Sequence, residues 1–351
     1  MTPAKNIVYL YSEVMPYAIS VMRVLAQDFG IAVDCICWDD ARKKTPFVPV
    51  NEPGITFHKR SSFTRESIIQ FIEGKNPPLL YISGRMDKLY LEAVLHFKDK
   101  IKIISACDNQ WDGSLKNKIA ALTSKWVYKK YFEYFWVPSQ RSYEYTRRMG
   151  YAKNKIVRNM YTGDANIFPK AFLDYKAAKK EKYPHELVYV GRFAKVKGLD
   201  LLVEAFTQAK NEVKNDWSLT LVGAGDVPVT ATADIKVKGF MTPQELANGS
   251  RNWGVFCLPS TKEPWGVVVH EFTMAGLPVI CSDNVGAGDS LVINNYNGFV
   301  FESGNLAALK NALIEMMAKP DEELWEMANR SHELSKYQSP TIAAYCLLSI
   351  L

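Results

Sequence analysis

The sequence predicts an α/β fold with two doubly wound, Rossmann-like domains that face each other across a cleft. In both halves of the 351-residue chain, short apolar runs typical of strands alternate with segments typical of helices. This alternation favours parallel sheets that are covered by helices on both faces. A polar, Lys-rich stretch at about residues 160–184 interrupts the alternation and is predicted to connect the halves. We therefore expect an N-terminal domain in residues 1–165 and a C-terminal domain in residues 166–335.

In the first half, the strand candidates are short runs rich in apolar and β-branched residues, and longer segments between them have helical patterns. The strands are predicted at 6–11, 31–37, 79–83, 101–106 and 135–137, and the helices at 15–29, 86–97, 114–131 and 139–149.

The same alternation restarts in the second half. Strands are predicted at 187–190, 217–222, 235–237, 253–260, 277–281 and 299–301, and helices at 198–209, from 266 onward, at 305–318 and at 322–334. The last segment, about 336–351, is apolar and helical, and we expect it to pack back onto the first domain.

Composition and charge narrow the class of protein. The net charge of +6 divides unevenly, because residues 1–180 hold 29 basic and 17 acidic side chains. A basic half suggests an anionic partner. The six cysteines are scattered, which indicates free thiols in a reducing cytoplasm. No secretory signal and no membrane-spanning run is recognised, so we expect a cytoplasmic protein, with attachment to the inner face of the cell membrane left open.

The segment from Glu263 to Glu271 is the most informative part of the chain. It follows a buried strand, and a Pro-Trp-Gly break separates Glu263 in a loop from Glu271 in the second turn of a helix. The first helical amides lack intrahelical acceptors and attract anions. A carboxylate on each side of such a site suits a ligand that has both phosphates and hydroxyls, such as a nucleotide sugar.

Two further strand-to-loop junctions contain glycine. Gly191-Arg192 and Lys197-Gly198 frame a basic loop after the first strand of the second half, where Gly191 allows close approach of the backbone and the two cations suit a phosphate. Gly223 begins a Gly-x-Gly turn after the next strand. Each junction alone is equally consistent with an ordinary surface turn.

Taken in order, these motifs are more specific. Gly-Arg…Lys-Gly is followed by Val-Gly-x-Gly, Lys-Gly-Phe, Leu-Pro-Ser, Glu-x7-Glu, Ala-Gly-Leu-Pro and Asn-Gly-Phe-Val. Over residues 186–335 this series resembles the nucleotide-sugar domain of the retaining glycosyltransferases of family 4 (glycosyl transferases group 1), which have the GT-B architecture.

The resemblance implies roles for individual residues. Arg192 and Lys197 match the basic pair that binds the donor diphosphate and stabilises the leaving group. Glu271 matches the glutamate that holds the ribose hydroxyls, and Glu263 matches the one near the donor sugar. The backbone at Trp265, Gly266, Val267 and Val268 would contact sugar and phosphates, the base would lie against Gly239 and Phe240, and Gly191 and Gly223 would complete the donor site.

No two aspartates are separated by one residue, so the chain has no Asp-x-Asp metal site. The resemblance therefore implies an enzyme without a metal or other cofactor, in which the basic pair replaces the cation and a UDP- or GDP-linked sugar is the substrate. His270, beside Glu271, is expected to have a structural role.

The acceptor side is less defined. The loop after the first strand, 12–17, has no glycine, unlike many members of the family. Asp108 stands where many members have a catalytic-side His, so it is our candidate for that position. It is equally consistent with a helix cap or a turn.

Residues 114–151 mix lysines with aromatic residues. Such a segment is typical of a helix at an anionic membrane surface, and it is equally consistent with a buried helix that has a solvated basic face. No recognisable nucleic-acid module is present. The aromatic residues are Trp126, Tyr128, Tyr131, Phe132, Phe135 and Trp136.

We expect a retaining, metal-independent hexosyltransferase that acts on a glycan or lipid-linked acceptor in cell-envelope polysaccharide or lipopolysaccharide biosynthesis. The alternatives are another GT-B enzyme, either an inverting transferase or a sugar-nucleotide epimerase, or a non-catalytic nucleotide-sugar-binding module.

Overall fold

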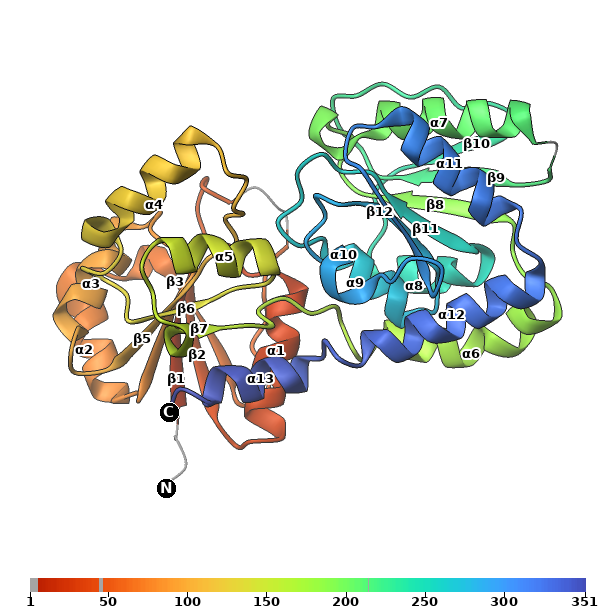
Figure 1. The fold of residues 1–351 in the computed structure, drawn as a ribbon. Helices are drawn as coiled ribbons and strands as arrows, with labels where there is room; N and C mark the ends of the chain where they lie inside the picture. Colours follow the sequence, from red (N-terminus) through yellow and green to blue (C-terminus); the bar gives the residue numbers. More distant parts are fainter. Residues whose placement is uncertain (1–5, 44–46, 214) are drawn as a thin grey trace. The chain divides into compact units, whose positions relative to one another are not determined.

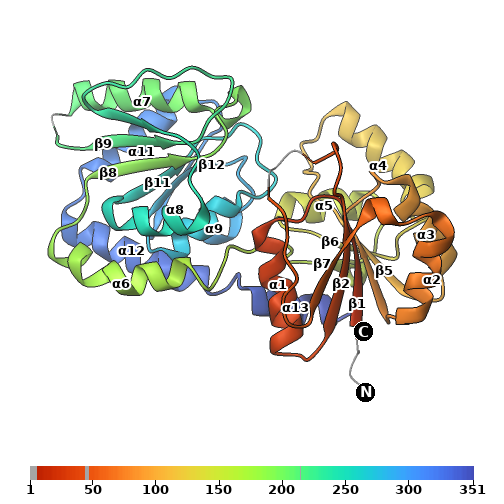
Figure 2. The same ribbon diagram turned by 180° about the vertical axis from the view of Figure 1, so that it is seen from behind.

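The computed structural model describes residues 6–43, 47–213 and 215–351. The chain divides into two compact units, and each is described by itself (Figures 1 and 2). Unit 1 comprises Met1–Thr162 with Pro340–Leu351, and unit 2 comprises Gly163–Ser339. The last helix, α13 (Pro340–Leu348), thus belongs to unit 1, where it lies beside α1 (Pro16–Gln27).

Unit 1 is built on a seven-stranded sheet with the order β3-β2-β1-β4-β5-β6-β7, in which every pairing is parallel. Helices α1 and α13 cover one face of the sheet, and α2, α3 and α5 contribute to the core on the other. The strands are β1 (Asn6–Tyr11), β2 (Ala32–Cys37), β3 (Ile55–Lys59), β4 (Leu79–Ile82), β5 (Lys102–Ala106), β6 (Tyr134–Trp136) and β7 (Ile156–Val157). The other helices are α2 (Arg65–Lys75), α3 (Lys88–Phe97), α4 (Leu115–Val127) and α5 (Gln140–Arg148).

Unit 2 is built on a six-stranded parallel sheet with the order β10-β9-β8-β11-β12-β13. Its strands are β8 (Glu186–Val190), β9 (Ser218–Val222), β10 (Ile235–Lys238), β11 (Val255–Leu258), β12 (Val279–Ser282) and β13 (Gly298–Phe301). Its helices are α6 (Phe168–Glu181), α7 (Leu199–Glu212), α8 (Pro243–Gly249), α9 (Val267–Met274), α10 (Gly288–Leu291), α11 (Leu306–Met317) and α12 (Asp321–Ser335).

The predicted fold class, two Rossmann-like parallel-sheet domains, is confirmed. Central strands were the easiest to predict because both of their faces are buried and their sequence is continuously apolar. Besides α6, five elements were not predicted: the edge strand β3, the two-residue β7, and the helices α2, α8 and α10. These elements are short or carry polar residues.

The prediction of a plain connection at 160–184 was wrong, because this segment contains α6. Phe168, Ala171 and Phe172 are buried at helical spacing on one side of α6. Lys170, Lys176 and Lys180 are exposed on this helix. The many lysines made the segment look uniformly polar in the sequence, so its narrow apolar stripe was not recognised.

Candidate functional site

The strand order of unit 2 changes direction between β8 and β11, which are neighbours in the sheet. In open parallel sheets, ligands bind in the crevice outside the carboxyl ends of the strands at such a switch point. The loop after β8 begins at Gly191, and the loop after β11 contains Glu263. The two motifs predicted from sequence therefore lie at the switch point of this sheet.

The loop after β8 carries the two predicted cations, Arg192 and Lys197. The Gly191 N–H donates to a carbonyl oxygen at the end of β9 (3.0 Å), which fixes the start of the loop. The loop ends at Gly198, whose φ of 67° is in the left-handed region. A Cβ on Gly198 would lie 2.3 Å from the Pro259 carbonyl oxygen, so the loops after β8 and β11 approach too closely for a side chain here. The side chain of Arg192 is exposed.

Lys197 and Glu263 form an ion pair across the switch point, between Lys197 Nζ and Glu263 Oε2. Their side chains are only 19% and 14% exposed. The backbone of Glu263 is also fixed, because its N–H donates to Asn284 (3.3 Å) and its carbonyl accepts from Gly286 (3.1 Å). The pair joins two loops that are separated by more than sixty residues, and the sequence did not predict it.

The first turn of α9, next to this pair, presents backbone donors that have no acceptor among the residues that the structure describes. Gly266, with φ 92°, precedes the helix, and the amides of Val267 and Val268 have no intrahelical acceptor. A Cβ on Gly266 would lie 3.2 Å from Glu263 Cγ and from Leu258 Cδ2. The glycine is therefore required by both its conformation and its surroundings, and it brings the helix start close to the Glu263 carboxylate.

Trp265 packs beneath this turn and is only 2% exposed. Its carbonyl oxygen accepts from the Ala287 N–H (2.8 Å), which ties the loop to the segment after β12. The indole N–H has no hydrogen-bond partner among the described residues. The indole ring is therefore buried, and the hydrogen bond described for Trp265 is made by its backbone.

Glu271 lies one turn further along α9 and is half-buried. Burial, followed by the negative charge of the nearby Asp164, raises the pKa of Glu271 to about 7. Gly163 lies directly against the glutamate, because a Cβ there would be 2.9 Å from Glu271 Cγ. Asp164 was not predicted, since it lies in a stretch without periodicity. The structure makes it a neighbour of the ribose-binding candidate.

His270 has the structural geometry that was expected of it. Its Nδ1 accepts from the Gly163 N–H (2.8 Å), and its Nε2 donates to the Ser335 carbonyl oxygen (3.0 Å). Burial lowers the pKa of His270 to about 4. The neutral ring therefore joins three segments of unit 2 and has no free nitrogen for chemistry.

The loops after β9 and β10 meet the loop after β8 at Gly223. The Gly223 N–H donates to the Lys238 carbonyl oxygen (3.0 Å), and a Cβ on Gly223 would lie 2.0 Å from the Gly191 carbonyl oxygen. The adjoining Gly239 is exposed, and the side chain of Phe240 is 80% exposed. The predicted donor-site residues thus lie on the loops that follow β8, β9, β10 and β11 and on the start of α9, at the carboxyl edge of one sheet.

Asp108, the remaining candidate, lies in unit 1. It follows β5 and is exposed. Its charge acts on Tyr17, where burial and then Asp108 raise the pKa of the phenol to about 12. Asp108 therefore lies near the first turn of α1, which follows the loop after β1, and its role on the acceptor side stays a prediction.

Most of the aromatic residues of 114–151 belong to the core of unit 1. Phe132, Phe135 and Trp136 are at most 3% exposed. The exposed apolar residues are instead on α4. Leu115, Ile119, Leu122 and Trp126 are 73%, 54%, 69% and 69% exposed, and their spacing places them on one side of the helix. None of the described helices is both long enough and apolar enough to cross a membrane.

Comparisons with known proteins find similar sequences over about half of the chain. Residues 173–337, just under half of the chain, match the family model "Glycosyl transferases group 1". An uncharacterized glycosyltransferase of Methanocaldococcus jannaschii is 28% identical over 177 residues, which cover 47% of this chain and 48% of that protein. The capsular polysaccharide biosynthesis glycosyltransferase CapM of Staphylococcus aureus is 28% identical over 197 residues, covering 50% and 49%. The alignments thus span about half the length of these relatives.

Similarity of fold extends over the whole chain. Anabaena HepE, in a crystal structure with UDP, has a TM-score of 0.73 at 16% identity, with 99% of this chain and 100% of that chain covered. Sucrose-phosphate synthase of Thermosynechococcus elongatus has a TM-score of 0.69 at 18% identity, covering 99% and 98%. Residues 173–337 are therefore similar to the glycosyl transferases group 1 family, and the whole chain has the GT-B type of fold.

Proposed function

We propose that the chain is a retaining, metal-independent glycosyltransferase that moves a hexosyl group from a UDP- or GDP-sugar to a glycan or lipid-linked acceptor. The observation that carries this proposal is the Lys197–Glu263 ion pair at the switch point, beside the unpaired amides of α9. A nucleotide sugar presents a diphosphate and several hydroxyls, which cations, amides and carboxylates recognise.

Each residue has a physical task in this reaction. The departing nucleoside diphosphate gains negative charge in the transition state, and Lys197 and Arg192 stabilise that charge. Glu271 accepts hydrogen bonds from the ribose hydroxyls, and Glu263 orients both Lys197 and the sugar. The acceptor attacks from the face that the diphosphate leaves, and a phosphate oxygen takes the acceptor proton. Lys197 and Arg192 supply the charge that a metal supplies in other transferases.

A role in cell-envelope polysaccharide or lipopolysaccharide synthesis is supported by the relative named for capsular polysaccharide biosynthesis. The exposed stripe of α4 adds a physical reason, because lysines such as Lys116 and Lys118 are exposed on the same helix. An apolar stripe flanked by lysines binds an anionic membrane surface at the level of the head groups. We therefore place the enzyme at the inner face of the membrane, where a lipid-linked acceptor is available.

The direct test is a transfer assay with UDP- and GDP-sugars and a set of glycan and lipid-linked acceptors, with and without EDTA, followed by NMR of the new anomeric centre. We expect transfer that is insensitive to EDTA and retains the anomeric configuration. Inversion, or epimerisation without an acceptor, would favour the other GT-B enzymes. Tight donor binding without hydrolysis or transfer would favour the binding module.

Membrane attachment is tested separately by co-sedimentation with phosphatidylglycerol vesicles. Leu122→Ser should lower the affinity for vesicles about tenfold, because a side chain of this size contributes roughly 1.5–3 kcal/mol when it leaves water. Leu173→Ser, at a 56% exposed leucine of α6, is the matched control and should bind like the wild type. Equal binding by both variants would exclude α4 as the contact.

A further inference from the structure

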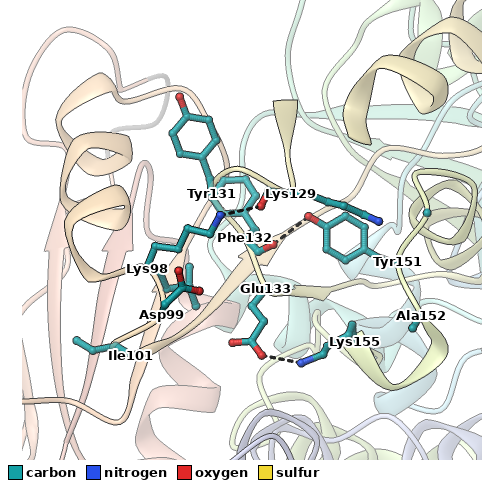
Figure 3. A pocket seen from close by; sticks show the side chains of 12 residues that line it. Lys98, Asp99, Ile101, Lys129, Tyr131, Phe132, Glu133, Tyr151, Ala152 and Lys155 are labelled. Carbon is teal, nitrogen blue, oxygen red and sulfur yellow. Dashed lines mark hydrogen bonds and ion pairs between the residues drawn. The ribbon is translucent and has the colours of Figure 1, made fainter. Parts of the chain in front are cut away.

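A cavity in unit 1 is lined by none of the predicted site residues (Figure 3). Its volume is about 360 Å³, and three chain segments line it: 98–103, 129–133 and 150–155. These segments lead into β5, β6 and β7, which are parallel neighbours. Parallel strands begin at the same edge of a sheet, so the cavity lies at the amino edge, opposite the edge that holds Asp108.

The lining carries three lysines, Lys98, Lys129 and Lys155, and two acidic residues, Asp99 and Glu133, a net charge of +1. Lys155 is occupied, because its Nζ lies 2.6 Å from Glu133 Oε1 and 3.0 Å from the Tyr134 hydroxyl. The Glu133 charge is thereby compensated. The remaining acid, Asp99, is exposed.

Two ammonium groups remain available to a ligand. Lys98 donates to the carbonyl oxygen of Lys129 at 3.3 Å, and the Lys129 Nζ lies 5.8 Å from the centre of the Tyr151 ring. Within the described part of the chain, neither lysine has a carboxylate at ion-pair distance. In Figure 3, both side chains are drawn at the same cavity as the Tyr131 and Tyr151 rings.

The remaining lining is apolar or aromatic. Ile101, Ile103 and Phe132 contribute hydrocarbon surface. The hydroxyl of Tyr151 is engaged by the carbonyl oxygen of Phe132 (3.0 Å), so this ring offers mainly its faces. A site with cations on one part of its lining and hydrocarbon on the rest suits an anion that carries a compact apolar or aromatic body.

We propose that this cavity binds a phosphate monoester, with Lys98 and Lys129 contacting the phosphate oxygens and the tyrosine and isoleucine side chains contacting the organic part. Lysine is a mobile point charge that serves phosphate oxygens well, and the volume suits a small ligand. The site is separate from the donor site in the chain. Its residues all belong to unit 1 and lie at the amino edge of that sheet, whereas the donor-site candidates lie at the carboxyl edge of the sheet in unit 2. The phosphate belongs either to a soluble metabolite or to a lipid head group.

The test uses phenyl phosphate as the probe and isothermal titration calorimetry as the measurement, at constant ionic strength. All titrations are made in the Lys197→Ala background as well as in the wild type, so that binding at the donor site is recognised. Lys98→Ala and Lys129→Ala should each weaken the cavity's affinity about tenfold, and Lys129→Arg should retain it. Lys88→Ala is the matched control, because it removes the same charge from a side chain that is 92% exposed and outside the cavity.

A second arm identifies the source of the phosphate. Vesicles that contain phosphatidic acid, a lipid phosphate monoester, are compared with phosphatidylglycerol vesicles of equal charge. A preference for phosphatidic acid that is lost in the Lys98→Ala/Lys129→Ala variant assigns the site to a head group, and phenyl phosphate binding without that preference assigns it to a soluble ligand. The proposal is overturned if neither probe binds, if Lys88→Ala weakens binding as much as the cavity variants do, or if all binding disappears in Lys197→Ala.

Discussion

Units 1 and 2 share the arrangement of their central strands but use the resulting crevice differently. In unit 1, β1 and β4 flank the switch point, and in unit 2 β8 and β11 do so. The loop after β1 is bonded to the loop after β4, because the Ser12 N–H donates to Ser83 Oγ (2.8 Å) and the two hydroxyls lie 3.1 Å apart. In unit 2 the corresponding loops meet through Gly198 and the Lys197–Glu263 pair.

The polar groups beyond β4 are also used internally. Asp87, only 3% exposed, accepts from the Trp38 indole (2.9 Å) and from the Arg42 and Arg60 guanidinium groups (2.9 Å each). In unit 2, by contrast, Arg192 is exposed and the first amides of α9 are unpaired. Strand order therefore creates a switch point in both units, and in unit 1 the protein's own hydrogen bonds and ion pairs use the polar groups there.

The largest expected effect is at Lys197. Lys197→Ala should lower the rate of transfer by about 10²–10³, because it removes a fixed cation from the leaving group. The kcat and the donor KM are measured, with unfolding in urea as a check on folding. Lys195→Ala is the control, since Lys195 is an exposed lysine of the same loop. A normal kcat in the Lys197→Ala enzyme would contradict the proposal that the switch point of unit 2, unlike that of unit 1, acts on the substrate.

Asp87 tests the expectation that the polar groups at the switch point of unit 1 stabilise the fold and do not bind a ligand. Asp87→Ala should destabilise the protein by about 3 kcal/mol, because it leaves buried donors and two guanidinium groups without their shared acceptor. Urea unfolding measures this loss. The affinity for a UDP-sugar, bound in unit 2, should not change in conditions where the protein is folded. A loss of affinity without a loss of stability would mean that Asp87 serves a ligand and not the fold.

The contrast also explains how far the sequence was informative. The sequence pattern placed Gly191, Arg192 and Lys197 in a loop after a strand and Glu271 in a helix, as in the structure, because these features depend on local backbone and chemistry. The pairing of Lys197 with Glu263 depends on β8 and β11 being neighbours in the sheet, and no local sequence pattern predicts which strands are neighbours. The proximity of Asp164 to Glu271 also depends on the tertiary fold, so it could not be predicted either.

The sequence of 114–151 was limited in a related way. Composition shows that aromatic residues and lysines are mixed there, but it does not show which side of each element meets the sheet. Phe132, Phe135 and Trp136 turned out to be core residues, and the exposed stripe is formed mainly by aliphatic residues of α4. Burial is a property of the tertiary fold, so the number of aromatic residues alone overestimated the exposed aromatic surface.

The third prediction concerns pH and Glu271. With a pKa of about 7, this side chain is mainly a carboxylic acid at pH 6 and mainly a carboxylate at pH 8. The carboxylate accepts from both ribose hydroxyls, so the affinity for a UDP-sugar should rise roughly tenfold between these values. A UDP-sugar is the right probe because, unlike UDP, it has no terminal phosphate that titrates near pH 6.

The stability of the ligand-free protein should change in the opposite direction. The pKa of Glu271 is raised on folding, so its contribution to stability is fully present below the unfolded pKa and is lost as the pH rises through about 7. Glu271→Gln should flatten both profiles. Affinity and stability that rise together with pH would show that another group dominates the titration.

The smallest expected effect is at Trp265, where side chain and backbone have separate roles. An unpaired buried N–H costs about 1–3 kcal/mol, so Trp265→Phe removes an unfavourable group together with some packing. The two changes should nearly cancel, which leaves stability within about 1 kcal/mol of the wild type by urea unfolding. Because the proposed donor contacts are made by the backbone of this turn, kcat and donor KM should stay within about twofold. A large loss of donor affinity in a stable Trp265→Phe protein would instead mean that the indole N–H reaches the ligand after a rearrangement of the loop, and the switch point of unit 2 would then be a mobile site and not a preformed one.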